Sequence, residues 1–263
     1  IIAAMELSLD PNGDGDFEDH YDIISMSLGA ECYNGYSEFC GPDDPGSRAV
    51  DNVVSNGIVA VIAAGNSGPN PITVGTPGVS RKAITVAASF DKNWEEEVGY
   101  RRDDCLQDPD VVDPIYATTN NLACFSSRGP VIHNNEAIIK PDISAPGVDI
   151  CAAQWDTAYG LDEFHSGSTK DVHSCQDGNH IAISGTSMAT PVVSGAIALI
   201  KEAHPDWSPE EIKQVIKNTA DDLGQNIISQ GYGRINVGNS VISGDPIIVA
   251  SIDLDVDMSG LSV

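Results

Sequence analysis

The sequence predicts an α/β fold, a doubly wound and mainly parallel sheet with helices on both faces. Apolar runs at 23–28, 58–63 and 83–89 are typical of buried strands, and the second is continuous in β-branched and small residues. Helical stretches alternate with these runs, which favours a parallel sheet. A sheet that proved mainly antiparallel would contradict this expectation.

Local signals place the remaining elements. Ser208, Pro209 and Glu211 form a capping box with proline at the first helical position, so a helix begins there. The other elements expected are helices at 1–9, 51–56 and 186–203, a strand within 142–153, and surface loops at 91–122 and 154–179. Gly57 is expected to end the second of these helices.

The length and hydrophobic content allow one sizeable core. The chain has 263 residues, of which 41% are hydrophobic, and nothing in it indicates two complete domains. Residues 1–244 are therefore expected to form a single domain. Polar and apolar residues alternate over 245–263, which predicts the start of a following β segment or domain.

The charge balance excludes several kinds of partner. There are 13 basic and 39 acidic residues, a formal net charge of −26, so nucleic acid and anionic membrane surfaces are poor partners. No apolar run reaches the roughly 18 residues that a membrane span needs. The acidic excess fits a high-salt adaptation, a set of cation sites or a soluble secreted protein, and the composition does not decide among the three.

Six cysteines raise the question of disulfides. None stands in a C-x-x-C pair, which argues against a zinc ribbon or a thioredoxin-like site. They fall into sequence neighbours, and the pairs expected are Cys32–Cys40, Cys105–Cys124 and Cys151–Cys175. Such pairing implies an oxidising, extracellular compartment. The alternative is buried free thiols.

One serine stands where an acyl-transfer nucleophile would be placed. Residues 185–191 read Gly-Thr-Ser-Met-Ala-Thr-Pro and continue into an apolar run that ends at Ile200. Ser187 would thus lie at the start of a buried helix, near free N–H groups and the positive end of the helix dipole. Those groups stabilise an oxyanion. The alternative is an ordinary helix-capping serine, and Ala189 rules out a G-x-S-x-G elbow.

These seven residues resemble the catalytic-serine signature of the subtilisin-like serine proteases, the subtilases. Further blocks resemble the same family in the expected order, at 23–29, 63–68, 125–130, 140–147 and 231–236. The resemblance runs from about Ile1 to Val241. It implies that residues 1–244 are a partial subtilase catalytic domain, and that the protein is a serine endopeptidase acting on extended polypeptides. A noncatalytic peptide-binding or calcium-stabilised module on the same scaffold is the alternative.

The resemblance also implies roles for particular residues. Ser187 would be the nucleophile, and the amide of Asn66 together with the Ser187 N–H would hold the oxyanion. The residues implied in substrate binding are Ser27, Leu28 and Gly29 on one edge, and Ala63, Ala64 and Gly65 on one wall of the primary specificity pocket. The first three would pair with an extended peptide. An ordinary core strand is the alternative for that segment.

Two family blocks are missing. Subtilases order their triad Asp, His, Ser, and neither the aspartate block nor the histidine block has a match here, because no histidine is followed by glycine. The histidines present are His20, His133, His165, His173, His180 and His204. The triad Asp and His are therefore expected upstream of Ile1, and the chain as given is expected to be inactive. A propeptide in the precursor and a monomeric enzyme are further expectations from the resemblance.

An aspartate-rich stretch between the first helix and the first strand predicts a calcium site. Oxygen-bearing side chains alternate, and Gly15 stands sixth, as in the first half of an EF-hand loop. The expected ligands are Asp10, Asn12, Asp14 and Asp16, with Asp19 or Asp22 closing the site, since position twelve is Tyr21. The alternative is a solvated acidic turn. The histidines and aspartates of 154–179 have irregular spacing, so a polar surface loop is favoured there over a metal site.

Overall fold

The computed structural model describes residues 1–32, 36, 40–91, 118–119, 122–153 and 180–244. The segment expected to begin a following β domain, at 245–263, lies outside this part of the chain. So do most of the loop at 91–122 and the whole of 154–179, with His165 and His173.

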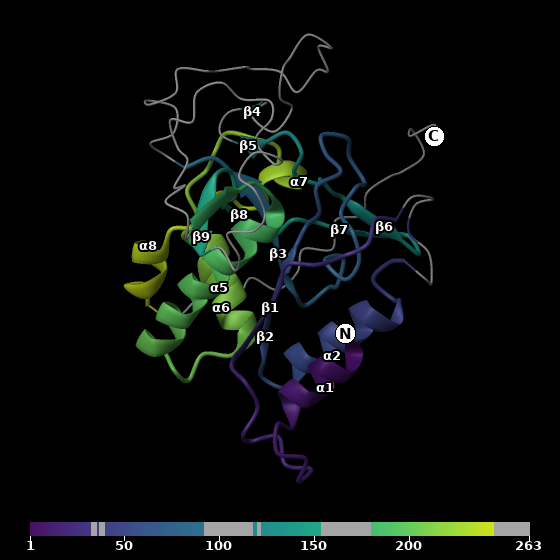
Figure 1. The fold of residues 1–263 in the computed structure, drawn as a ribbon, viewed down its shortest axis with the longest axis vertical. Helices are drawn as coiled ribbons and strands as arrows, with labels where there is room; N and C mark the ends of the chain where they lie inside the picture. The colour runs from purple at the N-terminus through teal and green to yellow at the C-terminus, as the bar shows by residue number, and fades with distance from the viewer. Residues whose placement is uncertain (33–35, 37–39, 92–117, 120–121, 154–179, 245–263) are drawn as a thin grey trace.

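A parallel sheet forms the centre of the molecule (Figure 1). Its strands are β1 (Ile23–Met26), β2 (Val59–Ala63), β3 (Ile84–Ser89) and β8 (Ile143–Pro146). β1 pairs with β2, β2 with β3, and β3 with β8, all in parallel. Two short antiparallel strands, β5 (Leu122–Ala123) and β4 (Thr118–Thr119), continue from the end of β3. The predicted parallel α/β architecture is confirmed.

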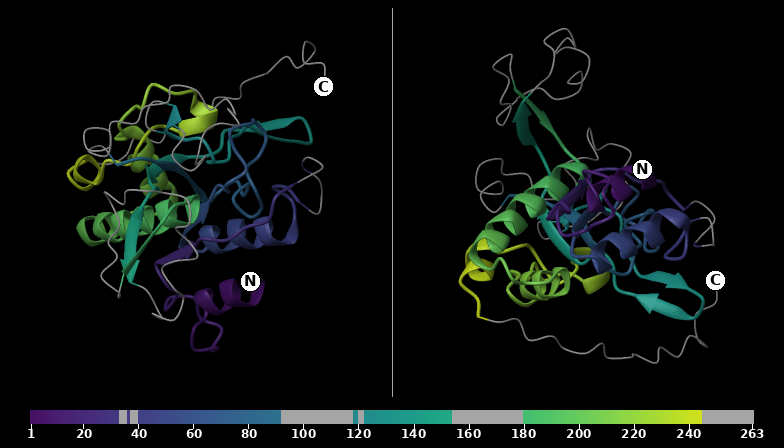
Figure 2. Two further views of the ribbon diagram at one scale, coloured as in Figure 1. Left: turned by 45° about the horizontal axis from the view of Figure 1, so that its top comes forward. Right: turned by 90° about the horizontal axis from the view of Figure 1, so that it is seen from below.

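Helices cover both faces of the sheet (Figures 1 and 2). The helices are α1 (Ile2–Leu9), α2 (Pro45–Ser55), α5 (Thr186–Ala203), α6 (Pro209–Asn218), α7 (Ile227–Gln230) and α8 (Val237–Val241). α5 packs against β1, β2, β3 and β8. α1 and α2 lie on the opposite face.

Strand β2 shows why two hydrophobic cores form. Successive side chains of a strand point to opposite faces. Val59 and Val61 are buried in the cluster that includes α5 and α6, whereas Ala60 and Ile62 are buried in the cluster that includes α1 and α2. A strand buried on both sides needs a continuous apolar sequence, which is the pattern that identified it.

Helix α6 begins as predicted, whereas helix α2 begins earlier than predicted. The capping box of α6 is confirmed, since Ser208 Oγ accepts from Glu211 N at 3.3 Å and Glu211 Oε2 accepts from Ser208 N at 2.7 Å. α2 begins at Pro45 rather than at the expected residue 51. Asp44 caps it by accepting from Ser47 N at 2.9 Å, and aspartate followed by proline is a helix-start signal that the expectation missed.

Several short antiparallel elements were not predicted. They are the pair β6 (Val131–His133) and β7 (Glu136–Ile138), and the pair β9 (Ile150–Ala153) and β10 (His180–Ile183). The strand expected within 142–153 is therefore two strands, of which only β8 belongs to the central sheet. β9 and β10 extend away from the body of the molecule (Figure 2).

The cysteine pairing is confirmed where the structure describes both partners. Cys32 and Cys40 form a disulfide. Cys124 and Cys151 are also disulfide-bonded. Their expected partners, Cys105 and Cys175, lie outside the described residues, so these two pairings stay predictions. None of the described helices combines the length and apolar character needed to cross a membrane.

A buried ionic cluster joins β3, β8 and α6 at the end of the sheet opposite the serine. Asp142 Oδ2 accepts from Lys140 Nζ at 2.7 Å and from Thr85 N at 2.9 Å, and its Oδ1 lies 3.1 Å from Lys213 Nζ. Both lysines also donate to Ala83 O, at 2.8 and 2.9 Å. Burial by itself would raise the pKa of Asp142, but the two ammonium groups outweigh it and hold that pKa well below its ordinary value.

Candidate active site

The carboxyl ends of β1 and β2 meet the beginning of α5. Parallel strands bring their carboxyl ends to one edge of the sheet, where open α/β folds bind ligands. A cavity of about 310 Å³ lies there. It is lined by Ser27, Leu28, Gly29, Ala30, Glu31, Ala63, Ala64, Gly65, Asn66, Thr73, Gly75, Thr186 and Ser187. The structure therefore brings the predicted nucleophile, the predicted oxyanion amide and all six predicted substrate-binding residues to one cavity.

The side chain of Asn66 is held in one orientation. Its Oδ1 accepts from Thr186 N and from Thr186 Oγ1, each at 3.0 Å. A backbone N–H can only donate, so the amide atom facing it must be the oxygen, and Nδ2 remains a donor. Thr186 Oγ1 also accepts from Gly65 N at 3.2 Å. Thr186 is a positioning residue that the sequence did not single out, although it stands inside the serine motif.

Two hydrogen-bond donors converge beside Gly185. A β-carbon built on this glycine would lie 3.6 Å from Asn66 Nδ2 and 3.7 Å from Ser187 N. Ser187 is the second residue of α5, and the first N–H groups of a helix have no partner within it. The side-chain amide and the helix N–H thus border one small volume next to the serine, with the positive end of α5 adding to their field.

Ser187 is half-buried and tied to the end of β1. Ser27 Oγ donates to the carbonyl oxygen of Ser187 at 2.6 Å, and Ser187 Oγ donates to Ser27 O at 3.4 Å. The second distance is long for a hydroxyl hydrogen bond. The serine hydroxyl is therefore only weakly engaged and can turn toward the cavity.

No described histidine hydrogen-bonds to the Ser187 hydroxyl. His20 Nδ1 lies 2.9 Å from Tyr21 O, His133 Nε2 lies 3.0 Å from Asp43 Oδ2, and His204 Nε2 lies 2.8 Å from Val241 O. His180 begins β10. The described part of the chain thus places an oxyanion site and a serine together without a general base.

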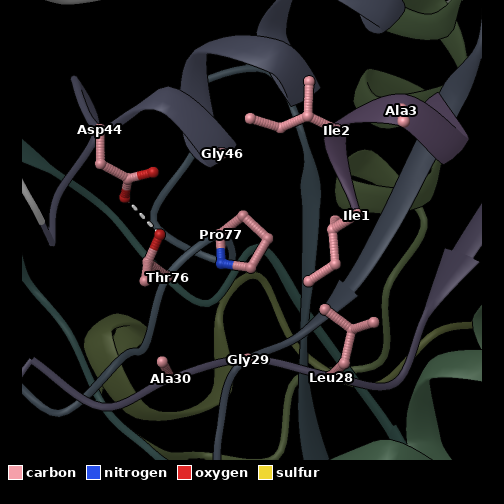
Figure 3. Close-up of a pocket in the computed structure, with 10 residues that line it drawn as sticks. All are labelled: Ile1, Ile2, Ala3, Leu28, Gly29, Ala30, Asp44, Gly46, Thr76 and Pro77. Atoms are coloured by element: carbon pink, nitrogen blue, oxygen red, sulfur yellow. Dashed lines mark hydrogen bonds between the residues drawn. The ribbon is translucent and has the colours of Figure 1, made fainter. Parts of the chain in front are cut away.

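A second, larger cavity adjoins the first. It has a volume of about 620 Å³ and shares Leu28, Gly29 and Ala30 with the cavity at Ser187. Its other lining residues are Ile1, Ile2, Ala3, Asp44, Gly46, Thr76 and Pro77 (Figure 3). The sequence did not predict it, because its walls come from segments far apart in the chain.

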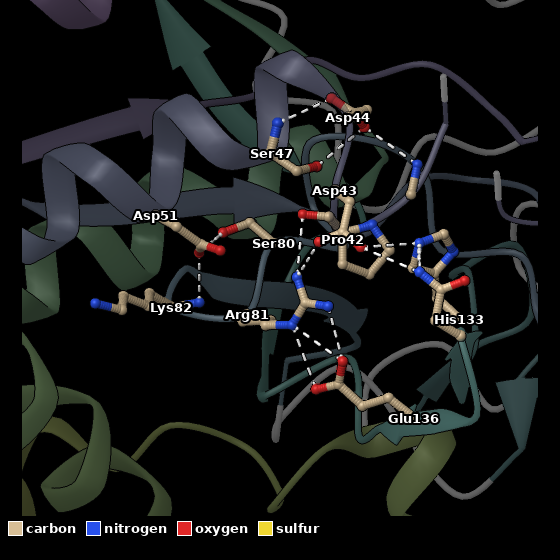
Figure 4. Close-up of polar contacts among 12 residues, drawn as sticks. Pro42, Asp43, Asp44, Ser47, Asp51, Ser80, Arg81, Lys82, His133 and Glu136 are labelled. Atoms are coloured by element: carbon tan, nitrogen blue, oxygen red, sulfur yellow. Dashed lines mark hydrogen bonds and ion pairs between the residues drawn. The ribbon is translucent and has the colours of Figure 1, made fainter. Parts of the chain in front are cut away.

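A polar network holds the residues that precede α2, of which Asp44 lines the larger cavity (Figure 4). Arg81 donates to Asp43 Oδ1 at 2.8 Å and to Glu136 Oε2 at 2.7 Å. His133 Nε2 contacts the other oxygen of Asp43 at 3.0 Å. Hydrogen bonding to Arg81 lowers the pKa of Asp43. The network joins the hairpin of β6 and β7 to the residues that precede α2.

The predicted calcium loop folds onto its own backbone. Asp10 Oδ1 accepts from Gly13 N at 2.7 Å, and Asp10 Oδ2 accepts from Gly15 N at 3.0 Å. Asn12 Nδ2 donates to Asp14 Oδ2 at 3.0 Å. Within the described residues no three His, Cys, Asp or Glu side chains are grouped so as to hold a metal ion.

The two candidate closing ligands are not brought to this turn as a cluster. Asp22 Oδ1 instead lies 3.5 Å from Lys201 Nζ on α5. The hard oxygen donors of the turn suit calcium, but the described structure holds them as a hydrogen-bonded turn.

Comparison with known proteins identifies the family. The sequence matches the Subtilase family over residues 1–234. It is similar to the Serine protease AprX of Bacillus subtilis (strain 168), with 38% identity over 92% of this chain and 47% of that protein. It is also similar to Pyrolysin of Pyrococcus furiosus, with 39% identity over 83% of this chain and 15% of that protein. The chain thus spans less than two thirds of either relative.

Solved structures agree on the fold. The self-cleaved protease domain of PatA has a TM-score of 0.57 and 20% identity, over 91% of this chain and 65% of that one. The Prenylagaramide maturation protease PagA has a TM-score of 0.55 and 20% identity, with the same coverage of both chains. With a family match over nearly the whole chain and a fold that agrees, this chain belongs to the subtilase family.

Proposed function

We propose that this chain is part of a serine endopeptidase in which Ser187 forms the acyl-enzyme. The observation that carries the proposal is the convergence of Asn66 Nδ2 and the Ser187 N–H beside Gly185, in the cavity that Ser187 lines. When Ser187 Oγ attacks the scissile carbonyl, the carbonyl oxygen becomes negative and both donors strengthen their hydrogen bonds to it. The family match and the relative named as a serine protease support the same chemistry.

The proton of Ser187 needs an acceptor during this attack. An imidazole from polypeptide outside these 263 residues would take it and later deliver it to the leaving amine, and a carboxylate would hold that imidazole in the right tautomer. Water, activated by the same imidazole, would then release the acyl group. This assignment rests on the missing aspartate and histidine blocks and on the absence of a described histidine at the serine.

The substrate is proposed to be an extended polypeptide lying along residues 27–29. None of the backbone hydrogen bonds among the described residues involves Leu28 or Gly29, so their N–H and C=O groups are available to a peptide. The two cavities share these residues. A bound peptide would therefore present one side chain to the cavity at Ser187 and another to the larger apolar cavity.

An active-site fluorophosphonate probe tests the reaction. In the polypeptide that carries the complete triad, we expect labelling that Ser187→Ala abolishes, because the probe reacts only with an activated serine. Ser194→Ala is the matched control, since that hydroxyl lies two turns along the same helix and contacts Ser25 Oγ at 2.9 Å. Labelling that survives Ser187→Ala, or its absence in the unmodified enzyme, would refute the proposal and favour a noncatalytic scaffold.

Asn66→Ala separates the oxyanion role from the nucleophile. Loss of one such donor costs about 10²–10³-fold in kcat in subtilisin, and we expect the same scale here with little change in KM. Steady-state kinetics on a peptide substrate would measure it. A change confined to KM would mean that Asn66 only binds the ground state.

We further propose an extracellular, monomeric enzyme that is made with a propeptide. The disulfide between Cys32 and Cys40 and the bonded state of Cys124 and Cys151 support an oxidising compartment. The propeptide and the monomeric state rest on the family alone.

Calcium is proposed to bind the turn at Asp10, Asn12, Asp14 and Asp16, with Asp19 or Asp22 completing the site. Bound calcium would neutralise carboxylates that otherwise repel one another. At free calcium of 100 times Kd, we expect stabilisation of about 2.7 kcal/mol, measured as a rise in Tm that a chelator reverses. Asp14→Asn should abolish this response and the exposed Asp206→Asn should keep it. An unchanged Tm would identify the loop as a solvated turn.

A further inference from the structure

A charged side chain lines the cavity beside Ser187. Among the thirteen described residues that line it, Glu31 is the charged one, and the others are small, apolar or neutral polar residues. A carboxylate in such a cavity distinguishes cationic from apolar and anionic side chains, because an ammonium or guanidinium group can form a charge-assisted hydrogen bond with it. We propose that Glu31 makes this cavity select lysine or arginine at P1, the residue whose carbonyl is attacked. This inference rests on the proposed function.

The carboxylate of Glu31 spans the two walls of the cavity. Glu31 continues the wall that carries Ser27 to Ala30, and its Oε1 accepts a hydrogen bond from Ser67 Oγ. Ser67 directly follows Asn66, which belongs to the opposite wall. The carboxylate is therefore bonded to the residue next to the oxyanion asparagine, and both residues line the cavity that would receive the P1 side chain.

The backbone on either side of Glu31 is constrained. Ala30 N donates to Thr76 O at 2.8 Å, and Thr76 N donates to Ala30 O at 2.9 Å. Gly75 permits this approach, since a β-carbon there would lie 2.6 Å from Ala30 O. On the other side, the disulfide from Cys32 to Cys40 closes the next loop. A charge on a constrained backbone loses less entropy when it binds a partner than one on a free loop.

The electrostatics of the whole chain favour the same substrates. The formal net charge is −26, so a cationic peptide is attracted before it reaches the cavity. That long-range attraction would act on any cationic substrate, wherever its charge lies. Only a charge inside the cavity makes the preference specific to P1, and this difference gives the test its control.

The experiment uses the polypeptide with the complete triad and peptide anilides that differ only at P1, which is lysine, arginine, norleucine or glutamate. In the unmodified enzyme, we expect the lysine and arginine substrates to have the highest kcat/KM. Glu31→Gln should lower the lysine-to-norleucine ratio about tenfold, the scale of a partly screened charge pair, and Glu31→Lys should favour glutamate. Glu202→Gln is the control, because Glu202 is exposed and its replacement changes the net charge by the same amount as Glu31→Gln. This variant should keep the lysine-to-norleucine ratio.

The outcomes separate this inference from the proposed function. Turnover that depends on Ser187 but shows a lysine-to-norleucine ratio unchanged by Glu31→Gln would overturn the P1 assignment and leave Glu31 as a tie to Ser67. No turnover with any of the substrates would instead refute the proposal that the protein is a serine endopeptidase. In that case, the side-chain preference of the cavity can still be measured by fluorescence anisotropy, with product peptides that end in lysine or norleucine. Tighter binding of the lysine peptide, lost in Glu31→Gln, supports the assignment, and equal binding overturns it.

Discussion

Assayed alone, the 263-residue chain is expected to hydrolyse casein far more slowly than a working protease. No described histidine reaches the Ser187 hydroxyl, so the serine keeps its proton and attacks poorly. Loss of the general base costs about 10⁶-fold in kcat in subtilisin, and the donors that remain provide only about 10³–10⁴-fold over water.

Release of acid-soluble peptides from casein would measure this rate, with Ser187→Ala as the control. The two proteins should hydrolyse casein at the same rate. Without a base the serine does not act as a nucleophile, so the remaining rate comes from the oxyanion donors, which both proteins keep. A substantial rate that Ser187→Ala abolishes would show that these residues include a base. His165 and His173, which lie outside the described residues, would then be the first to replace.

Asp142→Asn is expected to destabilise the folded protein strongly. The variant leaves the buried ammonium groups of Lys140 and Lys213 without their shared carboxylate, and both remain directed at Ala83 O. Removing one partner of a buried ion pair costs about 3–5 kcal/mol. Urea unfolding of the intact protein, followed by circular dichroism, would measure this loss.

The same carboxylate predicts the pH dependence of stability. The folded-state pKa of Asp142 is below its ordinary value of 3.8. Its contribution is therefore fully present above that value and is lost as the pH falls toward the folded-state pKa, since the unfolded state takes up the proton first. Asp142→Asn should weaken this acid dependence, whereas the exposed Asp206→Asn should preserve it. An equal loss in both variants would contradict the assignment.

Much of the layered fold was predictable because its signals are local. The continuous apolar run that becomes β2 must be buried on both faces, and the structure places a separate core on each. The serine motif lies where a buried helix begins, and α5 extends over the predicted residues, from Thr186 to Ala203. Convergence of Ser187 and Asn66 then follows from the parallel order of the strands.

The parts that were missed depend on contacts between distant segments. β9 pairs with β10, and the connecting residues 154–179 show no regular pattern. Glu31 stands in a polar loop sequence, and its place in the cavity depends on Ser67, which is 36 residues away. The larger cavity likewise combines the first residues of the chain with Thr76 and Pro77. Hydrophobic periodicity and motif spacing do not predict contacts between segments that are so far apart in the sequence.

The position of Ser187 on α5 has a consequence for heat inactivation. α5 is the helix that packs against four strands, and its residues Ala189, Val193, Ile197 and Ile200 are fully buried. Helices of this kind open only when the whole domain opens, whereas exposed loops open locally at little cost. The serine and its N–H are thus attached to a helix that we expect to be among the last of the described elements to open. Warming would therefore leave the nucleophile in place until the domain itself unfolds.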